Sequence, residues 1–148
     1  FRFGVKWWML IDLKTTKEKE HYIKEIYKLL EDKEKVSVSS ISRTLAVSKS
    51  SVSNMLKKLV KMELVNTAPY QPIILTKKGK ILAEKIVAKH RLIESFLVEI
   101  MGFKSCEVHL IAEEIEHINS PVFFRKVKNM LKEKDVDPHG SYIPDIDF

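Results

Sequence analysis

Residues 46–61 read AVSKSSVSNMLKKLVK, and this stretch decides the fold. Ser48 follows a tight break and is predicted to cap a helix over residues 49–62. One face of this helix carries an inward apolar stripe: Val52, Leu56, Leu59 and Val60. The opposite face carries short polar side chains first and lysines later: Lys49, Ser50, Ser53, Asn54, Lys57, Lys58 and Lys61. This order is typical of a DNA-reading helix, whose first residues approach base edges while longer cations reach phosphates. The alternative is an ordinary solvated helix face.

The segments on either side complete a known motif. Helical spacing of apolar residues predicts a first helix over about 20–32, and Ser37 or Ser39 can cap a second, short helix. After the third helix, residues 64–67 and 73–76 read as two short strands around a proline-stiffened tip, Ala68-Pro69-Tyr70-Gln71-Pro72. Three helices followed by a β-hairpin define a winged helix-turn-helix, whose wing touches the DNA backbone.

The rest of the chain is predicted to be helical. Thr76 caps a long helix that runs to about Met101 and stops at Gly102. A further helix spans about 105–117, and Ser120-Pro121 opens a last one to about Lys134, before a turn-rich tail. We therefore expect a mainly α protein with a small β-hairpin wing. Its predicted parts are a leader or expression-derived segment (1–15), a winged helix-turn-helix DNA-binding domain (16–80) and an all-α second domain (81–148).

Charge is segregated along the 148 residues. Residues 1–89 hold 19 Lys+Arg and 9 Asp+Glu, whereas residues 90–148 hold 7 and 11. A basic front and an acidic, histidine-bearing back suggest a polyanion partner for one and a cation for the other, although a segregated surface without function is the alternative. No apolar run is long enough to span a membrane. The single cysteine, Cys106, cannot form an internal disulfide, which favours a reducing cytoplasm.

A second constellation carries metal-binding chemistry. On the helix 105–117, the side chains of His109, Glu113, Glu116 and His117 share one face, and on the long helix His90 and Glu94 project together. Borderline divalent metals prefer this mixture of imidazole nitrogen and carboxylate oxygen. The alternative is two surface helices with i,i+4 ion pairs.

Enzymatic signatures are missing. Glu114-x-x-His117 matches half of a di-iron signature, and no second copy exists. Because there is no phosphate loop or nucleophile elbow either, we expect a switch and no enzyme.

The motifs resemble those of the DtxR/MntR family of metal-dependent transcriptional repressors. The resemblance rests on residues 21–27 (HYIKEIY), 51–59 (SVSNMLKKL), 75–79 (LTKKG), 89–94 (KHRLIE), 115–117 (IEH) and 140–144 (GSYIP). It implies a homodimer whose second domain is a helical metal-binding and dimerisation domain. It further implies a palindromic double-stranded DNA operator, and one or two Mn²⁺ or Fe²⁺ ions per subunit as corepressor for metal-homeostasis genes.

The resemblance also assigns metal ligands. His90, Glu94 and His109 match one site, and Glu113, Glu116 and His117, with His21 from the first helix, match the other. Glu113 is a manganese-type residue, whereas His109 is found in the iron type. Lys24 stands where manganese-type members have a glutamate. Long members add a third, SH3-like domain that supplies ligands to the first site.

For DNA contact, we expect small polar residues of the third helix to lie near bases and cations to lie on the backbone. The predicted base-facing residues are Ser48, Lys49, Ser50, Ser51, Ser53 and Asn54, and the predicted backbone contacts are Arg43, Lys57 and Tyr70. Cys106 is expected to be a partly buried residue at a helix start. Two alternatives remain: a winged-helix regulator gated by an organic ligand, and a metalloenzyme with an incidental helix-turn-helix.

Overall fold

A computed structural model describes residues 15–148 as two compact units that divide between Ala83 and Glu84. The leader segment predicted at the start of the chain, apart from Thr15, lies outside the described residues. Helix α5 (Lys77–Glu99) contains the point of division, three residues beyond the predicted domain boundary. No helix within residues 15–148 is both long and apolar enough to cross a lipid bilayer.

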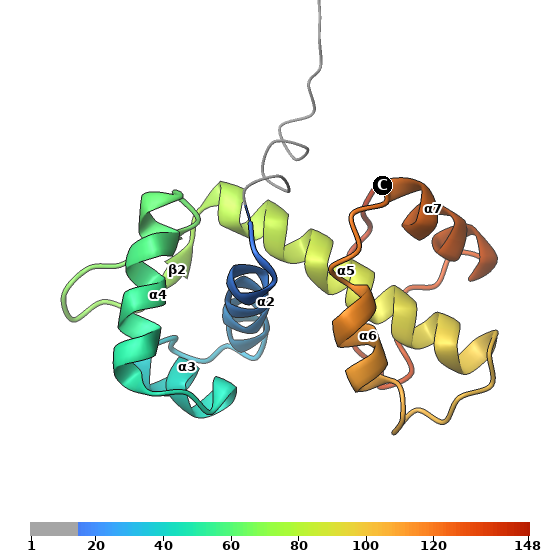
Figure 1. The fold of residues 1–148 in the computed structure, drawn as a ribbon, viewed down its shortest axis with the longest axis horizontal. Coiled ribbons are helices and arrows are strands. Elements are labelled where there is room, and N and C mark those ends of the chain that lie inside the picture. The colour runs from blue at the N-terminus through green and yellow to red at the C-terminus, as the bar shows by residue number, and fades with distance from the viewer. Residues whose placement is uncertain (1–14) are drawn as a thin grey trace, which may run out of the picture. The chain divides into compact units, whose positions relative to one another are not determined.

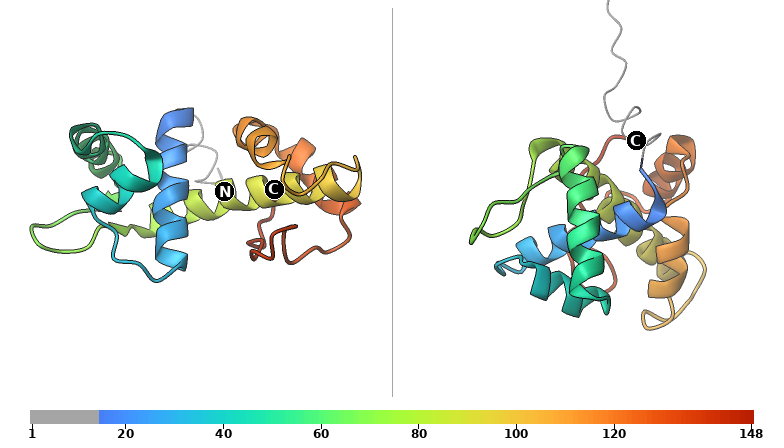
Figure 2. Two further views of the ribbon diagram at one scale, coloured as in Figure 1. Left: turned by 90° about the horizontal axis from the view of Figure 1, so that it is seen from below. Right: turned by 60° about the vertical axis from the view of Figure 1, so that its left-hand side comes forward.

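The first unit is a winged helix-turn-helix. Its helices are α2 (Lys17–Glu31), α3 (Val38–Leu45) and α4 (Lys49–Lys61). Strands β1 (Val65–Asn66) and β2 (Ile74–Leu75) pair antiparallel, with Val65 opposite Leu75. The loop between these strands projects away from the three helices in Figures 1 and 2.

Side-chain caps fix where the helices of this unit begin. The hydroxyl of Ser37 accepts from the backbone N–H of Ser40, and the hydroxyl of Ser48 accepts from that of Ser51. Thr76 caps α5, because its hydroxyl accepts from Gly79 N–H at 2.9 Å. These bonds satisfy amide groups that lack a partner in the first turn of a helix, and they confirm the predicted starts of α4 and α5.

Close packing joins α5 to the hairpin at Gly79. A Cβ atom at this position would lie 1.9 Å from the carbonyl oxygen of Leu64, so only glycine fits without a shift of backbone. Leu64 and Val65 are fully buried, as are Ile41, Val52 and Leu59.

The prediction that Val60 belongs to the inward apolar stripe of α4 is wrong. Val60 is 40% exposed, whereas Met55, which the stripe omitted, is buried. The narrow core-facing arc of α4 passes through Val52, Met55, Leu56 and Leu59, and Val60 lies beyond its edge.

In the second unit, α6 (His109–Ile115) and α7 (Pro121–Met130) pack against the later part of α5. The shared core contains Leu92, Ala112 and Phe124, all buried. After α7, the tail (residues 135–148) covers the same core, burying Ile143 and Phe148.

Two helices of this unit are shorter than predicted. Instead of beginning at Ser105, α6 begins at His109, because residues 104–107 form a turn in which the Glu107 carboxylate accepts from Lys104 N–H. Cys106 lies in this turn and is exposed, contrary to the expectation of partial burial. Helix α7 begins at Pro121 after the predicted Ser120 cap, and ends early because Lys132 and Glu133 adopt positive φ.

Candidate metal centre and nucleic-acid interface

A buried carboxylate on α5, Glu94, is the centre of the candidate metal site. Its Oε1 lies 2.9 Å from His90 Nε2 and 3.3 Å from His109 Nδ1, and its Oε2 lies 3.1 Å from His139 Nδ1. The Glu94 residue is only 2% exposed. One carboxylate thus faces three imidazole rings.

The surroundings of Glu94 favour its ionised form. Burial by itself raises the pKa of this carboxyl, but the hydrogen bond to His90, the charges of His90 and His139 and the hydrogen bond to His109 outweigh burial and lower the pKa from 4.5 to about 2. Glu94 is therefore a carboxylate at every physiological pH, which is the form that binds a cation.

Two groups of donor atoms meet at Glu94. His90, Glu94 and His109 each offer an atom within 4.8 Å of the others, and so do Glu94, Asp137 and His139. The predicted set His90, Glu94 and His109 is therefore brought together. Imidazole nitrogens and carboxylate oxygens at this spacing suit Mn²⁺ or Fe²⁺, so the residues fit the ions that the resemblance implies.

Asp137 and His139 were not singled out as candidate donors from the sequence. They lie in the tail, more than 40 positions after Glu94, in the segment Asp137-Pro138-His139-Gly140. A histidine inside a proline–glycine turn of the acidic half is the signal that could have marked them.

In the second predicted ligand set, the carboxylates of Glu113 and Glu116 each lie next to a histidine ring. Glu116, fully buried, places Oε2 2.5 Å from His90 Nδ1 and Oε1 3.3 Å from His117 Nε2. Glu113 Oε1 lies 3.2 Å from His109 Nε2. Each carboxylate is thus paired with an imidazole, and His90 links the two predicted sets. His21 lies on α2 in the first unit, and its role as a fourth ligand stays a prediction.

The predicted DNA-contacting residues lie at the surface of the first unit. Eight of the nine are exposed and Ser53 is half-buried; the eight are Arg43, Ser48, Lys49, Ser50, Ser51, Asn54, Lys57 and Tyr70. Tyr70 stands at the tip of the wing with its side chain fully in solvent. Ser48 is also the N-cap of α4, so its hydroxyl already serves the helix start.

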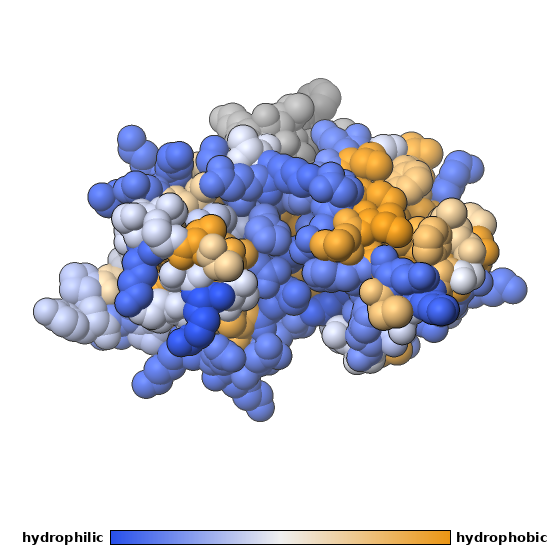
Figure 3. Space-filling model, turned by 60° about the horizontal axis from the view of Figure 1, so that its bottom comes forward, coloured by the Kyte–Doolittle hydropathy of each residue, from blue (hydrophilic) through white to orange (hydrophobic). Residues whose placement is uncertain are grey.

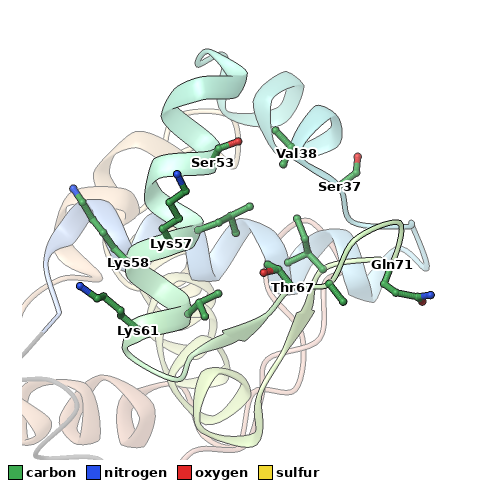
Figure 4. A pocket seen from close by; sticks show the side chains of 12 residues that line it. Ser37, Val38, Ser53, Lys57, Lys58, Lys61, Thr67 and Gln71 are labelled. Carbon is green, nitrogen blue, oxygen red and sulfur yellow. The ribbon is translucent and has the colours of Figure 1, made fainter.

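A groove of about 700 Å³ separates α4 from the wing (Figure 4). Lysines of α4 stand along one side, and Thr67 and Gln71 of the wing stand on the other. Its lining includes Lys57, Lys58 and Lys61 and no acidic residue. This side of the first unit is therefore suited to a polyanion.

Two lysines of the basic segment do not contribute to that surface. Lys85 and Lys89 are each 7% exposed. The Lys89 ammonium donates to the carbonyl oxygen of Ile118 at 3.2 Å and lies 4.9 Å from the centre of the Phe124 ring. Lys89 thus holds the loop between α6 and α7.

The second unit exposes apolar side chains. Figure 3 shows hydrophobic surface gathered over this unit. Its exposed large apolar residues are Ile100, Met101, Leu110, Ile118, Val122, Phe123, Met130, Val136 and Tyr142. Gathered apolar surface of this kind is typical of an interaction site, such as an interface with another protein surface.

These features define the class of protein: a winged-helix protein with a basic face suited to DNA and a second unit suited to a metal ion and to another protein surface. Comparisons with known proteins agree. Residues 14–73 match the family model of the iron-dependent repressor N-terminal DNA-binding domain. Residues 76–145 match that of the iron-dependent repressor metal-binding and dimerisation domain.

Individual relatives are regulators. The HTH-type transcriptional regulator MntR of Bacillus subtilis strain 168 is 41% identical over 103 residues, which cover 70% of this chain and 72% of the relative. The structure of the manganese regulator SloR is 42% identical with a TM-score of 0.76, over 86% of this chain and 59% of that one. A manganese-dependent transcriptional repressor in complex with manganese is 34% identical with a TM-score of 0.80, over 87% and 59%. The chain thus spans about three fifths of these two solved chains.

The chain belongs to the DtxR/MntR family of iron- and manganese-dependent transcriptional repressors. Its relatives are transcriptional regulators and not enzymes. The winged helix-turn-helix and the homodimerisation domain predicted from the sequence are confirmed.

Proposed function

We propose that this protein represses metal-homeostasis genes in the cytoplasm by binding a palindromic operator when Mn²⁺ or Fe²⁺ is bound. The observation that carries the proposal is the cluster of His90, Glu94 and His109 donor atoms within 4.8 Å. This cluster lies on α5 and α6, and α5 begins in the DNA-binding unit.

The clustered side chains prepare a site for a divalent cation. Glu94 is ionised and buried, and Asp137 and His139 extend its donor set on the other carboxylate oxygen. A bound divalent ion would supply positive charge beside the Glu94 carboxylate. Since histidines must lose protons to become ligands, we expect metal affinity to fall below roughly pH 6.

For the DNA side, the proposal assigns base contacts to the first two turns of α4 and backbone contacts to Arg43, Lys57 and Tyr70. A homodimer would present two copies of α4 to successive major grooves, which explains the palindrome. Asn54 can pair with adenine in a bidentate manner, whereas serines give weaker direct contacts, so DNA shape contributes to specificity.

The resemblance supports one further ligand, His21, beside Glu113, Glu116 and His117. A cation bound by ligands from both domains would favour one geometry of the DNA-binding domain. A tenfold shift in population requires about 1.4 kcal/mol of preference for that geometry. We expect His21→Ala to weaken metal-dependent DNA binding and to leave the dimer intact, as measured by anisotropy and sedimentation; unchanged metal activation would remove His21 from the ligand set.

Fluorescence anisotropy tests the whole proposal. The protein is titrated without oxygen into a labelled duplex from the region upstream of its own coding sequence, with EDTA and then with Mn²⁺, Fe²⁺ or Mg²⁺. Tight binding with Mn²⁺ or Fe²⁺ alone supports the metal-gated repressor and ranks the two ions. Equal binding in EDTA would make the clusters structural and favour a regulator that metal does not gate. No DNA binding under any condition would contradict the function.

A further inference from the structure

The tail carries Asp137 and His139 in a turn that closes on itself. Asp137 Oδ1 accepts from the backbone N–H groups of His139 and Ser141, at 2.8 and 2.9 Å. Gly140 adopts a φ of +87° and donates its N–H to the carbonyl oxygen of Asp137. These bonds fix the shape of the turn, but they do not attach it to α5.

Arg91 adds an attachment at the base of the turn, besides the bonds of the His139 ring to Glu94 and to the carbonyl oxygen of Ser105. Arg91 is 6% exposed, and its Nη1 donates to the carbonyl oxygen of Tyr142 at 2.5 Å. Its Nε lies 4.0 Å from Asp137 Oδ2. Tyr142 pairs with Val136 in an antiparallel bridge, so the bond from Arg91 reaches the base of the turn.

Arg91 and Glu94 both contact the turn from one face of α5. They are three positions apart, which places them on neighbouring turns of the same side of the helix. Glu94 meets the ring of His139, and Arg91 holds Tyr142. The 4.0 Å between Arg91 Nε and Asp137 Oδ2 is an ion-pair distance, longer than a hydrogen bond.

We infer that Arg91 is a positioning residue for the group Glu94, Asp137 and His139. It seats the turn against α5 before a metal ion arrives, and it binds no metal itself because a guanidinium has no free lone pair for a ligand. Without it, the base of the turn loses its bond to α5, so part of the ordering falls to metal binding and lowers affinity. This inference rests on the proposed metal site.

The test compares two arginines that hold the same tail. Arg91→Met removes the bond to Tyr142, whereas the control Arg125→Met removes a bond of 3.0 Å from Arg125 Nε to the carbonyl oxygen of Phe148, away from the metal donors. Mn²⁺ affinity is measured by calorimetry on the full chain, Co²⁺ coordination by its visible absorption, and the order within the turn by amide hydrogen exchange of His139 and Ser141 without metal.

We expect Arg91→Met to lower Mn²⁺ affinity about tenfold, as loss of a residue that orients ligands typically does. It should also change the Co²⁺ spectrum and speed exchange at His139 and Ser141. Arg125→Met should leave affinity within about twofold of wild type, on the same reasoning that it orients no ligand. Arg91→Lys keeps a donor and should restore part of the affinity.

Each contrary result has a distinct meaning. Equal Mn²⁺ affinity in wild type and Arg91→Met would overturn the inference, and so would equal losses in Arg91→Met and Arg125→Met. If circular dichroism shows that Arg91→Met does not fold, Arg91→Lys decides: a smaller loss with a changed Co²⁺ spectrum supports the role, and wild-type behaviour overturns it. Absence of Mn²⁺ and Co²⁺ uptake by the wild type would overturn the proposed function itself.

Discussion

The two units of the molecule place their polar chemistry in opposite ways. In the first unit, the residues proposed to contact DNA lie at the surface, and Tyr70 is fully exposed. In the second unit, the carboxylates at the centre of the proposed sites are buried, with Glu94 at 2% and Glu116 at 0% exposure. The polar face of α4 and the tip of the wing are exposed to solvent. The Glu94 carboxylate instead contacts three imidazole rings.

This difference in burial predicts how large the effects of substitutions will be in each unit. Exposed charges contribute small, nearly independent amounts of binding energy, because water screens them. Buried charges depend on a complete set of partners, and removal of one leaves the others unpaired at high cost. Substitutions should therefore have large, coupled effects in the second unit and small, additive effects in the first.

The largest effect is expected from Glu94→Gln. Glu94 serves both groups of donor atoms, so the substitution removes a charged ligand from each. We expect Mn²⁺ affinity to fall at least about a hundredfold, the upper range seen for disruption of a metal's environment. Calorimetric titration measures this, with Glu114→Gln as the control, since Glu114 is an exposed carboxylate of α6. Equal affinity of the two variants would contradict the placement of the site.

An intermediate effect is expected on the stability of the metal-free protein. The pKa of Glu94 is lowered to about 2 in the folded chain, so its ionised form stabilises the fold above pH 4.5, and this stability is lost as the pH falls through 2. Urea denaturation in EDTA at pH 6 should show wild type more stable than Glu94→Gln by about 2 kcal/mol. This gap should narrow between pH 4.5 and 2. A gap that stays constant would show that ionisation of Glu94 does not stabilise the fold.

The smallest effect is expected from Lys57→Ala on the exposed face of α4. If Lys57 contacts one phosphate, the slope of log binding constant against log salt should decrease by about one. The affinity for operator and random DNA should fall alike. Lys104→Ala removes the same charge from an exposed position in the second unit and should leave the slope unchanged. An unaltered slope in Lys57→Ala places this lysine outside the interface.

Features set by neighbouring residues could be predicted from the sequence. Ser48, Thr76 and Ser120 cap their helices through bonds to amides three positions away. The pairing of His90 with Glu94 follows from one turn of helix. Such interactions depend on local geometry, which the order of residues determines directly.

Features set by distant contacts could not be predicted. His139 reaches Glu94 across 45 positions, through a tail that has no regular periodicity. The start of α6 was misplaced because a turn closed by Glu107 competes with the helix. Val60 lines the groove between α4 and the wing and is not part of the core. This placement depends on where the wing folds back, which the sequence of α4 does not determine. In each case tertiary packing overrides a local preference.

The position of Glu94 between two donor groups has a thermodynamic consequence. Its Oε1 faces His90 and His109, and its Oε2 faces His139, so two cations sharing this carboxylate would be close neighbours. The first ion would repel the second, since like charges a few ångströms apart interact strongly in a buried setting. Occupancy would then rise in two steps at different metal concentrations, which widens the range over which the chain responds.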